Sequence, residues 1–238
     1  MKIEKPKKIQ TLGEEISNAV SHGVGALLAV AGAVLIIIRA VLTGTGGIGI
    51  TSAAIYGGSL IVLYTFSTLY HSLTNDTAKK VFRIFDHCSI FLLIFGSYMP
   101  ITLVLLGGFK GWMLFGVNLF CTLLGIVFNS INLTKWHKAS MVLYIIMGWS
   151  VVAIIKDVLA KMPTPGMILL AIGGVLYTVG IIFYKNRRIK FMHFIWHLFV
   201  LGGSVLQFFA IFFYCYKLSV FLYRDGAIPK NALNFLQK

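Results

Sequence analysis

The chain has 238 residues, of which 58% are hydrophobic and only 12% are charged, and its mean hydropathy is +0.87. A composition this apolar excludes an ordinary soluble domain and indicates an integral membrane protein. The formal net charge of +14 comes mainly from basic residues that flank apolar stretches, so it indicates membrane topology and anionic headgroups, with no nucleic acid as partner.

Seven apolar stretches follow one another along the chain, each with about 20 residues, the length that crosses a hydrocarbon core of roughly 30 Å. The first stretch carries Asn18 and His22 near its start, and the third contains Pro100, which should kink it. Short loops, several of them rich in glycine or proline, separate the stretches and leave no room for a second domain. The predicted spans are 17–42, 48–71, 82–106, 112–131, 140–158, 166–184 and 191–216.

The sequence therefore predicts an all-α integral membrane protein built as a seven-transmembrane helix bundle. Its predicted parts are a basic N-terminal arm (1–16), the helix domain (17–216) and a C-terminal tail (217–238). Most of the 21 basic residues lie in the arm and in the second, fourth and sixth loops, so the positive-inside rule places the N-terminus in the cytoplasm. An odd number of spans then places the C-terminus outside. No cleavable signal peptide is recognisable, so the first span should remain as an anchor.

Two histidines at the start of the last span, His193 and His197, lie one helical turn apart in the segment HFIWH. This spacing places both imidazoles on one helix face, as two ligands of one metal ion require. His71 ends the second span, and Asp86 lies in the first turns of the third. The predicted topology puts all four side chains at one depth, near the cytoplasmic face. A lone histidine in a helix bundle is more often a hydrogen-bonding residue than a ligand, but this convergence favours a metal site.

Three neutral imidazoles suit zinc and leave a fourth coordination position open, which is typical of a catalytic site. A buried carboxylate without a partner is costly, which favours a place for Asp86 in the same site as the histidines. A carboxylate near zinc-bound water can accept its proton, so Asp86 is the candidate base. Ser67 precedes His71 by four residues and is assigned a supporting role, with a hydrogen bond to its own helix as the alternative. His22 is a candidate to support the ligands from the first span. His87 lies about 100° around the helix from Asp86 and should face elsewhere.

These motifs, in this order and at these spacings, resemble the bacterial hemolysin III branch of the progestin and adipoQ receptor (PAQR) family. The resemblance rests on the segments EEISNAVSHGVG and FDHCSI and on the SxxxH and HxxxH motifs, and it covers roughly residues 13–216. It implies a seven-helix protein of the bacterial cell membrane with a cytoplasmic N-terminus. Adiponectin receptors of the family hold an intramembrane zinc with three histidines that match His71, His193 and His197. An aspartate that matches Asp86 lies close to that zinc.

The family is similar to alkaline ceramidases in these motifs, which implies zinc-dependent hydrolysis of a membrane lipid amide or ester, with Asp86 as base and Ser67 assisting. Two alternatives stay open. One is a pore-forming cytolysin, the activity that the family's name records, although a chain this apolar should stay in its own membrane. The other is a non-enzymatic regulator of membrane lipid homeostasis in which zinc braces the bundle. The expected partners are a zinc ion and a membrane lipid.

Overall fold

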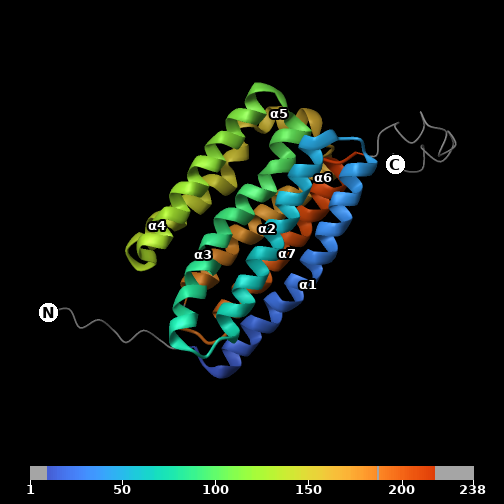
Figure 1. Cartoon of the computed structure of the whole chain (residues 1–238). Helices are drawn as coiled ribbons and strands as arrows, with labels where there is room; N and C mark the ends of the chain where they lie inside the picture. The colour runs from blue at the N-terminus through green and yellow to red at the C-terminus, as the bar shows by residue number, and fades with distance from the viewer. Residues whose placement is uncertain (1–9, 187, 218–238) are drawn as a thin grey trace.

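The computed structural model describes residues 10–186 and 188–217, and these residues form helices and no strands. Figure 1 shows the helices packed side by side in an elongated bundle. Within the described ranges, six helical segments are long and apolar enough to cross a membrane. The predicted tail, apart from residue 217, lies outside the described residues. The elements are α1 (Leu12–Leu42), α2 (Gly46–Ser72), α3 (Asp76–Met99), the π-helix η1 (Pro100–Leu106), α4 (Gly108–Trp149), the 3-10 helix η2 (Ser150–Ile154), α5 (Ile155–Lys161), α6 (Thr164–Lys185) and α7 (Met192–Tyr214).

The fourth and fifth predicted spans fall within one helical segment of 54 residues, Gly108–Lys161. Its backbone leaves the helical conformation at Asn132, whose φ is −161° and ψ is 93°. Across this break, Asn118 Nδ2 donates a hydrogen bond of 3.1 Å to Ser150 Oγ, 32 residues further along. In a continuous helix these two residues would be roughly 48 Å apart. The segment therefore folds back at Asn132, and its two arms pack against each other (Figure 1).

Local sequence explains two further features of the helices. Thr11 and Glu14 form a capping box, so α1 begins at Leu12, before the predicted start of the first span. Pro100 lacks a backbone N–H and begins a π-helical turn, which ends at Gly107 with a φ of 59°. The third predicted span is thus perturbed at Pro100 but not interrupted.

Close helix contacts hold the bundle together in two pairs. A Cβ atom added at Gly57 of α2 would lie 2.6 Å from Ala33 Cβ of α1. A Cβ atom added at Gly173 of α6 would lie 3.1 Å from the Gly203 carbonyl oxygen of α7. Small residues at such contacts let helix backbones approach closely in a membrane. These contacts keep α1 beside α2 and α6 beside α7.

Polar and apolar side chains are arranged as a lipid environment requires. Large apolar side chains such as Leu27 of α1, Phe120 of α4 and Ile182 of α6 are exposed on the outside of the bundle. Among the buried polar side chains, Asn18, His22, His71 and His197 lie in the helix turns where α1 and α7 begin and α2 ends. Figure 1 shows these helix ends at one end of the bundle. The candidate site lies at that end.

Candidate metal centre

Three histidines from two helices form a compact cluster. His71 lies in the last turn of α2, and His193 and His197 lie in the first two turns of α7. One ring nitrogen of each lies within 4.8 Å of the other two. His71 and His197 are buried, with relative exposures of 3% and 2%. The structure thus brings together the three imidazoles that the sequence assigned to one metal ion.

The hydrogen bond of His71 determines which of its two ring nitrogens is available to bind a metal ion. Its Nδ1 lies 2.7 Å from Glu15 Oε2, and Glu15 Oε1 accepts a bond of 2.8 Å from Lys79 Nζ. A carboxylate accepts, so Nδ1 donates its hydrogen, and in the neutral imidazole Nε2 then carries the lone pair. That Nε2 is buried and has no hydrogen-bond partner. An unpaired buried polar atom costs about 1–3 kcal/mol, a penalty that a bound metal ion would remove.

His197 is held in the same tautomer from a different helix. Its Nδ1 lies 3.2 Å from the backbone oxygen of Asn18 in α1. Because a carbonyl oxygen can only accept, Nδ1 donates here and the lone pair is again on Nε2. Ser21 Oγ lies 3.3 Å from the same Nδ1. Metal-binding histidines in proteins use their second nitrogen in this way, to fix the ring and raise its basicity.

Glu14 holds the start of α7, which carries the other two histidines of the cluster. Its Oε1 accepts a hydrogen bond of 3.0 Å from the backbone N–H of Phe191, the residue before α7 begins. Among the described residues, Phe191 is the single non-glycine residue with positive φ, at 62°. A left-handed backbone conformation at an aromatic residue costs of order 1–3 kcal/mol, so it persists only where surrounding contacts stabilise it. The same carboxylate caps α1 through Thr11, so it ties the two helix starts together.

Glu14 and Glu15 fall in the predicted arm, so their contacts with Phe191 and His71 could not be predicted from the sequence pattern used. In the structure they lie in the first turn of α1. A signal was present: Glu14, Asn18, Ser21 and His22 recur at i, i+4, i+7 and i+8, on one face of an otherwise apolar helix. All four are buried. Polar side chains on a buried helix face in a membrane require partners. Here Asn18 and Ser21 contact His197 of the cluster, and Glu14 accepts from the backbone at the start of α7.

His22, the fourth histidine at this end, lies against the cluster without joining it. Its ring stacks on His197, with centroids 3.6 Å apart and an interplanar angle of 13°. It meets the ring of Tyr64 edge-on, with centroids 5.0 Å apart. Both of its nitrogens are buried and lack a hydrogen-bond partner. His22 therefore packs as a support for His197, the position that the sequence suggested for it.

Asp86 and Ser67 are placed differently from the three histidines. Among the described residues, the carboxylate of Asp86 is not part of the cluster of ligand atoms. Its Oδ2 lies 3.5 Å from Nδ1 of the neighbouring His87. Ser67 is buried, with an exposure of 1%, one turn before His71 on α2. The roles of base and supporting hydroxyl stay predictions.

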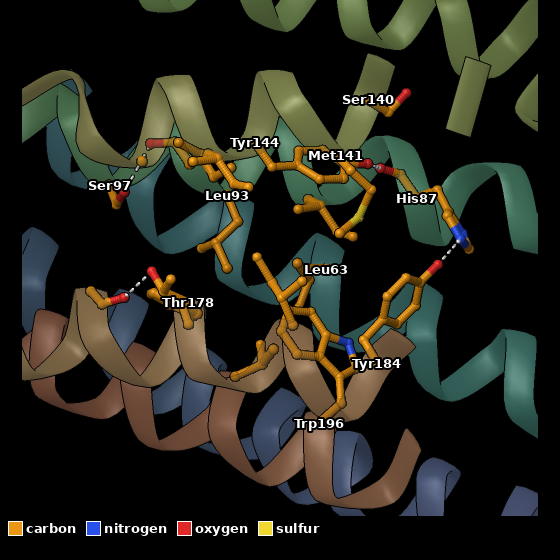
Figure 2. Close-up of a pocket in the computed structure, with 18 of the residues that line it drawn as sticks. Leu63, His87, Leu93, Ser97, Ser140, Met141, Tyr144, Thr178, Tyr184 and Trp196 are labelled. Atoms are coloured by element: carbon orange, nitrogen blue, oxygen red, sulfur yellow. Dashed lines mark hydrogen bonds between the residues drawn. The ribbon is translucent and has the colours of Figure 1, made fainter. Parts of the chain in front are cut away.

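Two cavities, each comprising about 1080 Å³ including its open mouth, adjoin the cluster. The first cavity, called the vestibule, is the more polar one and includes His71 and His193 in its lining. The second, called the apolar cavity, lies between α3 and α4 on one side and α6 and α7 on the other (Figure 2). Other vestibule residues are Gln10, Glu14, Glu15, Lys79 and Arg83. The apolar cavity is lined by residues such as Leu93, Met141, Ile145, Ile181, Trp196 and Val200.

Comparison with known proteins gives consistent matches over most of the chain. The sequence pattern of one family, described as Haemolysin-III related, matches residues 10–208. Hemolysin-3 of Bacillus cereus is 42% identical over 205 residues, which is 86% of this chain and 93% of the relative. A Hemolysin-3 homolog of Bacillus subtilis (strain 168) is 42% identical over 207 residues, which is 87% of this chain and 97% of the relative. The human monocyte to macrophage differentiation factor is 30% identical over 173 residues, 70% of this chain and 71% of the relative.

Proposed function

The chain belongs to the haemolysin-III related family, and we propose that it is a zinc-dependent hydrolase that cleaves an amide or ester bond of a membrane lipid. It is a multi-pass protein of the bacterial cell membrane. The observation that carries the proposal is the state of His71. Glu15 holds its Nδ1, its Nε2 is buried without a hydrogen-bond partner, and one of its ring nitrogens lies within 4.8 Å of a nitrogen of His193 and of His197.

The donor set fits zinc better than the other common metal ions of proteins. Three imidazoles and no carboxylate make up the cluster among the described residues, whereas magnesium and calcium prefer oxygen ligands. His71, His193 and His197 would hold the ion and leave one position open. When bound there, zinc supplies a Lewis acid that activates water for hydrolysis at neutral pH.

The protein's own side chains are assigned the remaining tasks. Glu15 and the Asn18 carbonyl orient two imidazoles by accepting hydrogen bonds from Nδ1 of His71 and of His197, which in the neutral rings puts the lone pair on Nε2. Asp86 is proposed as the base that accepts a proton from the attacking water at a carboxylate oxygen. Ser67, buried on the same helix as His71, is proposed to donate a hydrogen bond to the carbonyl oxygen of the scissile group.

A lipid substrate is supported by the two cavities. Ligand pockets are typically lined by apolar side chains with a few polar groups, and the lining of the apolar cavity has this character. We propose that it receives an acyl chain, while the vestibule receives the polar part of the lipid. The hydrolysable bond would then lie where both meet the histidine cluster.

For the membrane topology we propose seven crossings with the N-terminus in the cytoplasm and the C-terminus outside. The fold-back at Asn132 supports this, because the two arms of α4 then count as separate crossings. The distribution of basic residues supports the orientation. The metal centre would accordingly lie near the cytoplasmic face.

The proposal is tested with purified protein loaded with zinc and given ceramide-like amides and phospholipids. Hydrolysis of at least one class is expected, with loss of at least about 100-fold in the Asp86→Asn variant, the size of a typical general-base contribution. Asp157→Asn is the matched control, since Asp157 pairs with the exposed Lys110, an interaction that does not involve the cluster. A zinc-loaded protein that is inert across the panel would overturn the proposal.

A second candidate function is favoured by the names of the relatives. Two proteins that are 42% identical to this chain carry the name Hemolysin-3, which suggests permeabilisation of target membranes. Leakage of a dye from liposomes distinguishes the two candidates. Leakage that persists in a His193→Ala and His197→Ala double variant would favour a pore in which the metal centre has only a structural part. Leakage that is lost in the double variant would show that permeabilisation requires the two histidines.

A further inference from the structure

The vestibule and the apolar cavity share two lining residues. His87 of α3 and Tyr184 of α6 are the side chains that appear in both linings within the described parts of the chain. They reach toward each other from opposite sides, as Figure 2 shows. The hydroxyl of Tyr184 and Nε2 of His87 lie 3.4 Å apart. The boundary between the polar and the apolar compartment therefore coincides with one side-chain contact.

The hydrogen bonding of His87 shows how this contact works. Its Nδ1 lies 2.8 Å from the backbone oxygen of Arg83 and 3.5 Å from Asp86 Oδ2. Both of these atoms accept, so Nδ1 is the donor and Nε2 carries the lone pair. Tyr184 consequently donates its hydroxyl hydrogen to Nε2. At 3.4 Å this bond is longer than the usual range for O–H donors, so little free energy is needed to open it.

The contact also lies beside the predicted reacting groups. The ring of Tyr184 is 5.8 Å from that of His193, a proposed zinc ligand, and 5.6 Å from that of Trp196 in the apolar cavity. On the other side, His87 contacts Asp86, the proposed base. A chain that passes from the apolar cavity to the vestibule would therefore pass between His87 and Tyr184, next to the histidine cluster.

We propose that His87 and Tyr184 form a gate, which separates the apolar cavity from the vestibule when their side chains are hydrogen-bonded and joins the two compartments when they separate. Its use in admitting a lipid to the metal centre rests on the proposed hydrolase function. The barrier that the closed gate forms between the two cavities does not depend on that function, because it follows from the cavities and the two side chains between them. The closed gate keeps water of the vestibule out of the acyl compartment until a lipid occupies it.

The barrier is tested by thiol accessibility in a variant whose three native cysteines are replaced by alanine. Ser97 lines the apolar cavity and bonds only to the Ile94 carbonyl of its own helix among the described contacts, so Ser97→Cys is a conservative reporter. Asn186→Cys reports on the vestibule. The reagent is a small anionic methanethiosulfonate, which is soluble in water and does not partition into apolar cavities. We expect rapid reaction at position 186 and slow reaction at position 97.

Variants of the gate then separate its two components. Removing the hydroxyl with Tyr184→Phe should speed the reaction at position 97 about twofold, less than the roughly fivefold effect of a neutral hydrogen bond of typical strength, because this bond is long. Tyr184→Ala removes the ring as well and should speed it further. Tyr177→Phe is the matched control, because Tyr177 lines the apolar cavity and its hydroxyl contacts Ser204, without lining the vestibule. It should leave the rate unchanged.

Two results would overturn the gate. One is a cysteine at position 97 that already reacts as fast as the one at position 186. The other is a rate at position 97 that stays slow in Tyr184→Ala while zinc content shows an intact metal centre. A protein that shows the expected accessibility pattern but hydrolyses no lipid would instead refute the hydrolase function and leave the barrier established, so the two failures are distinguishable.

Discussion

The carboxylate of Glu15 lies 2.7 Å from Nδ1 of His71, although the two residues are 56 positions apart. Glu15 belongs to the first turn of α1 and His71 to the last turn of α2, so the contact joins the two ends of a helical hairpin. The other nitrogen of His71, Nε2, is buried without a hydrogen-bond partner, and the His71 ring belongs to the histidine cluster. A helix that supplies no ligand thus orients the metal centre.

Removing the Glu15 carboxylate should weaken metal binding without removing a ligand. Glu15→Ala is expected to lower zinc affinity about 10- to 100-fold, the effect of losing a residue that orients a metal-binding histidine. Glu15→Gln should lose less, because its amide oxygen can still accept from Nδ1. Competition with a fluorescent zinc chelator measures both. Affinity in Glu15→Ala equal to that of the unaltered protein would show that the contact does not orient His71.

Two neighbouring glycines in α2 should differ sharply when replaced by alanine. A Cβ at Gly57 would lie 2.6 Å from Ala33 Cβ and 2.8 Å from its backbone Cα, so α1 and α2 must move apart. Gly57→Ala should lower stability by about 1–3 kcal/mol. Gly58 has no atom within 4 Å of such a Cβ, and Gly58→Ala should be neutral or stabilising by up to about 1 kcal/mol.

Thermal unfolding in detergent compares the two alanine variants. Equal melting temperatures for both would contradict the close packing of α1 against α2. Because α1 carries Glu14, Glu15 and Asn18, Gly57→Ala should also weaken zinc binding, whereas Gly58→Ala should not.

Removing zinc with a chelator should destabilise the protein only by emptying the proposed site at the three histidines. At a free zinc concentration of 100 times the dissociation constant, binding stabilises the folded state by about 2.7 kcal/mol. For a chain of this size, removing the metal should lower the melting temperature by roughly 5–10 °C. His71→Ala should melt at one temperature with or without chelator. A chelator effect of the same size in both proteins would place the relevant metal elsewhere.

Much of the candidate site could be predicted from local spacing and topology. His193 and His197 share a helix face because they are four residues apart, and the alternation of spans brings the end of α2 to the start of α7. The spacing of the two histidines is a local property of the sequence, and the meeting of α2 and α7 follows from the number of predicted spans between them. The three histidines therefore meet as the sequence predicted.

The parts that could not be predicted depend on helix ends and long-range contacts. Hydrophobicity marks where a helix enters lipid, but the capping box of Thr11 extends α1 further, and this extension positions Glu14 and Glu15. The contact between His87 and Tyr184 joins residues 97 positions apart, and spacing within one helix carries no information about it. Likewise, Asn132 starts the second arm of α4 by accepting from the Lys135 N–H, a capping role that hydropathy does not show.

The central claim is that His71, His193 and His197 hold a metal ion, and metal analysis of protein purified without added zinc tests it most directly. The unaltered protein should contain about one zinc ion per chain, as a site with three imidazole ligands requires, and His71→Ala should contain almost none. His137→Ala is the control, since His137 lines the apolar cavity and not the cluster. Equal zinc content in the unaltered protein and in His71→Ala, or no metal in either, would contradict the account.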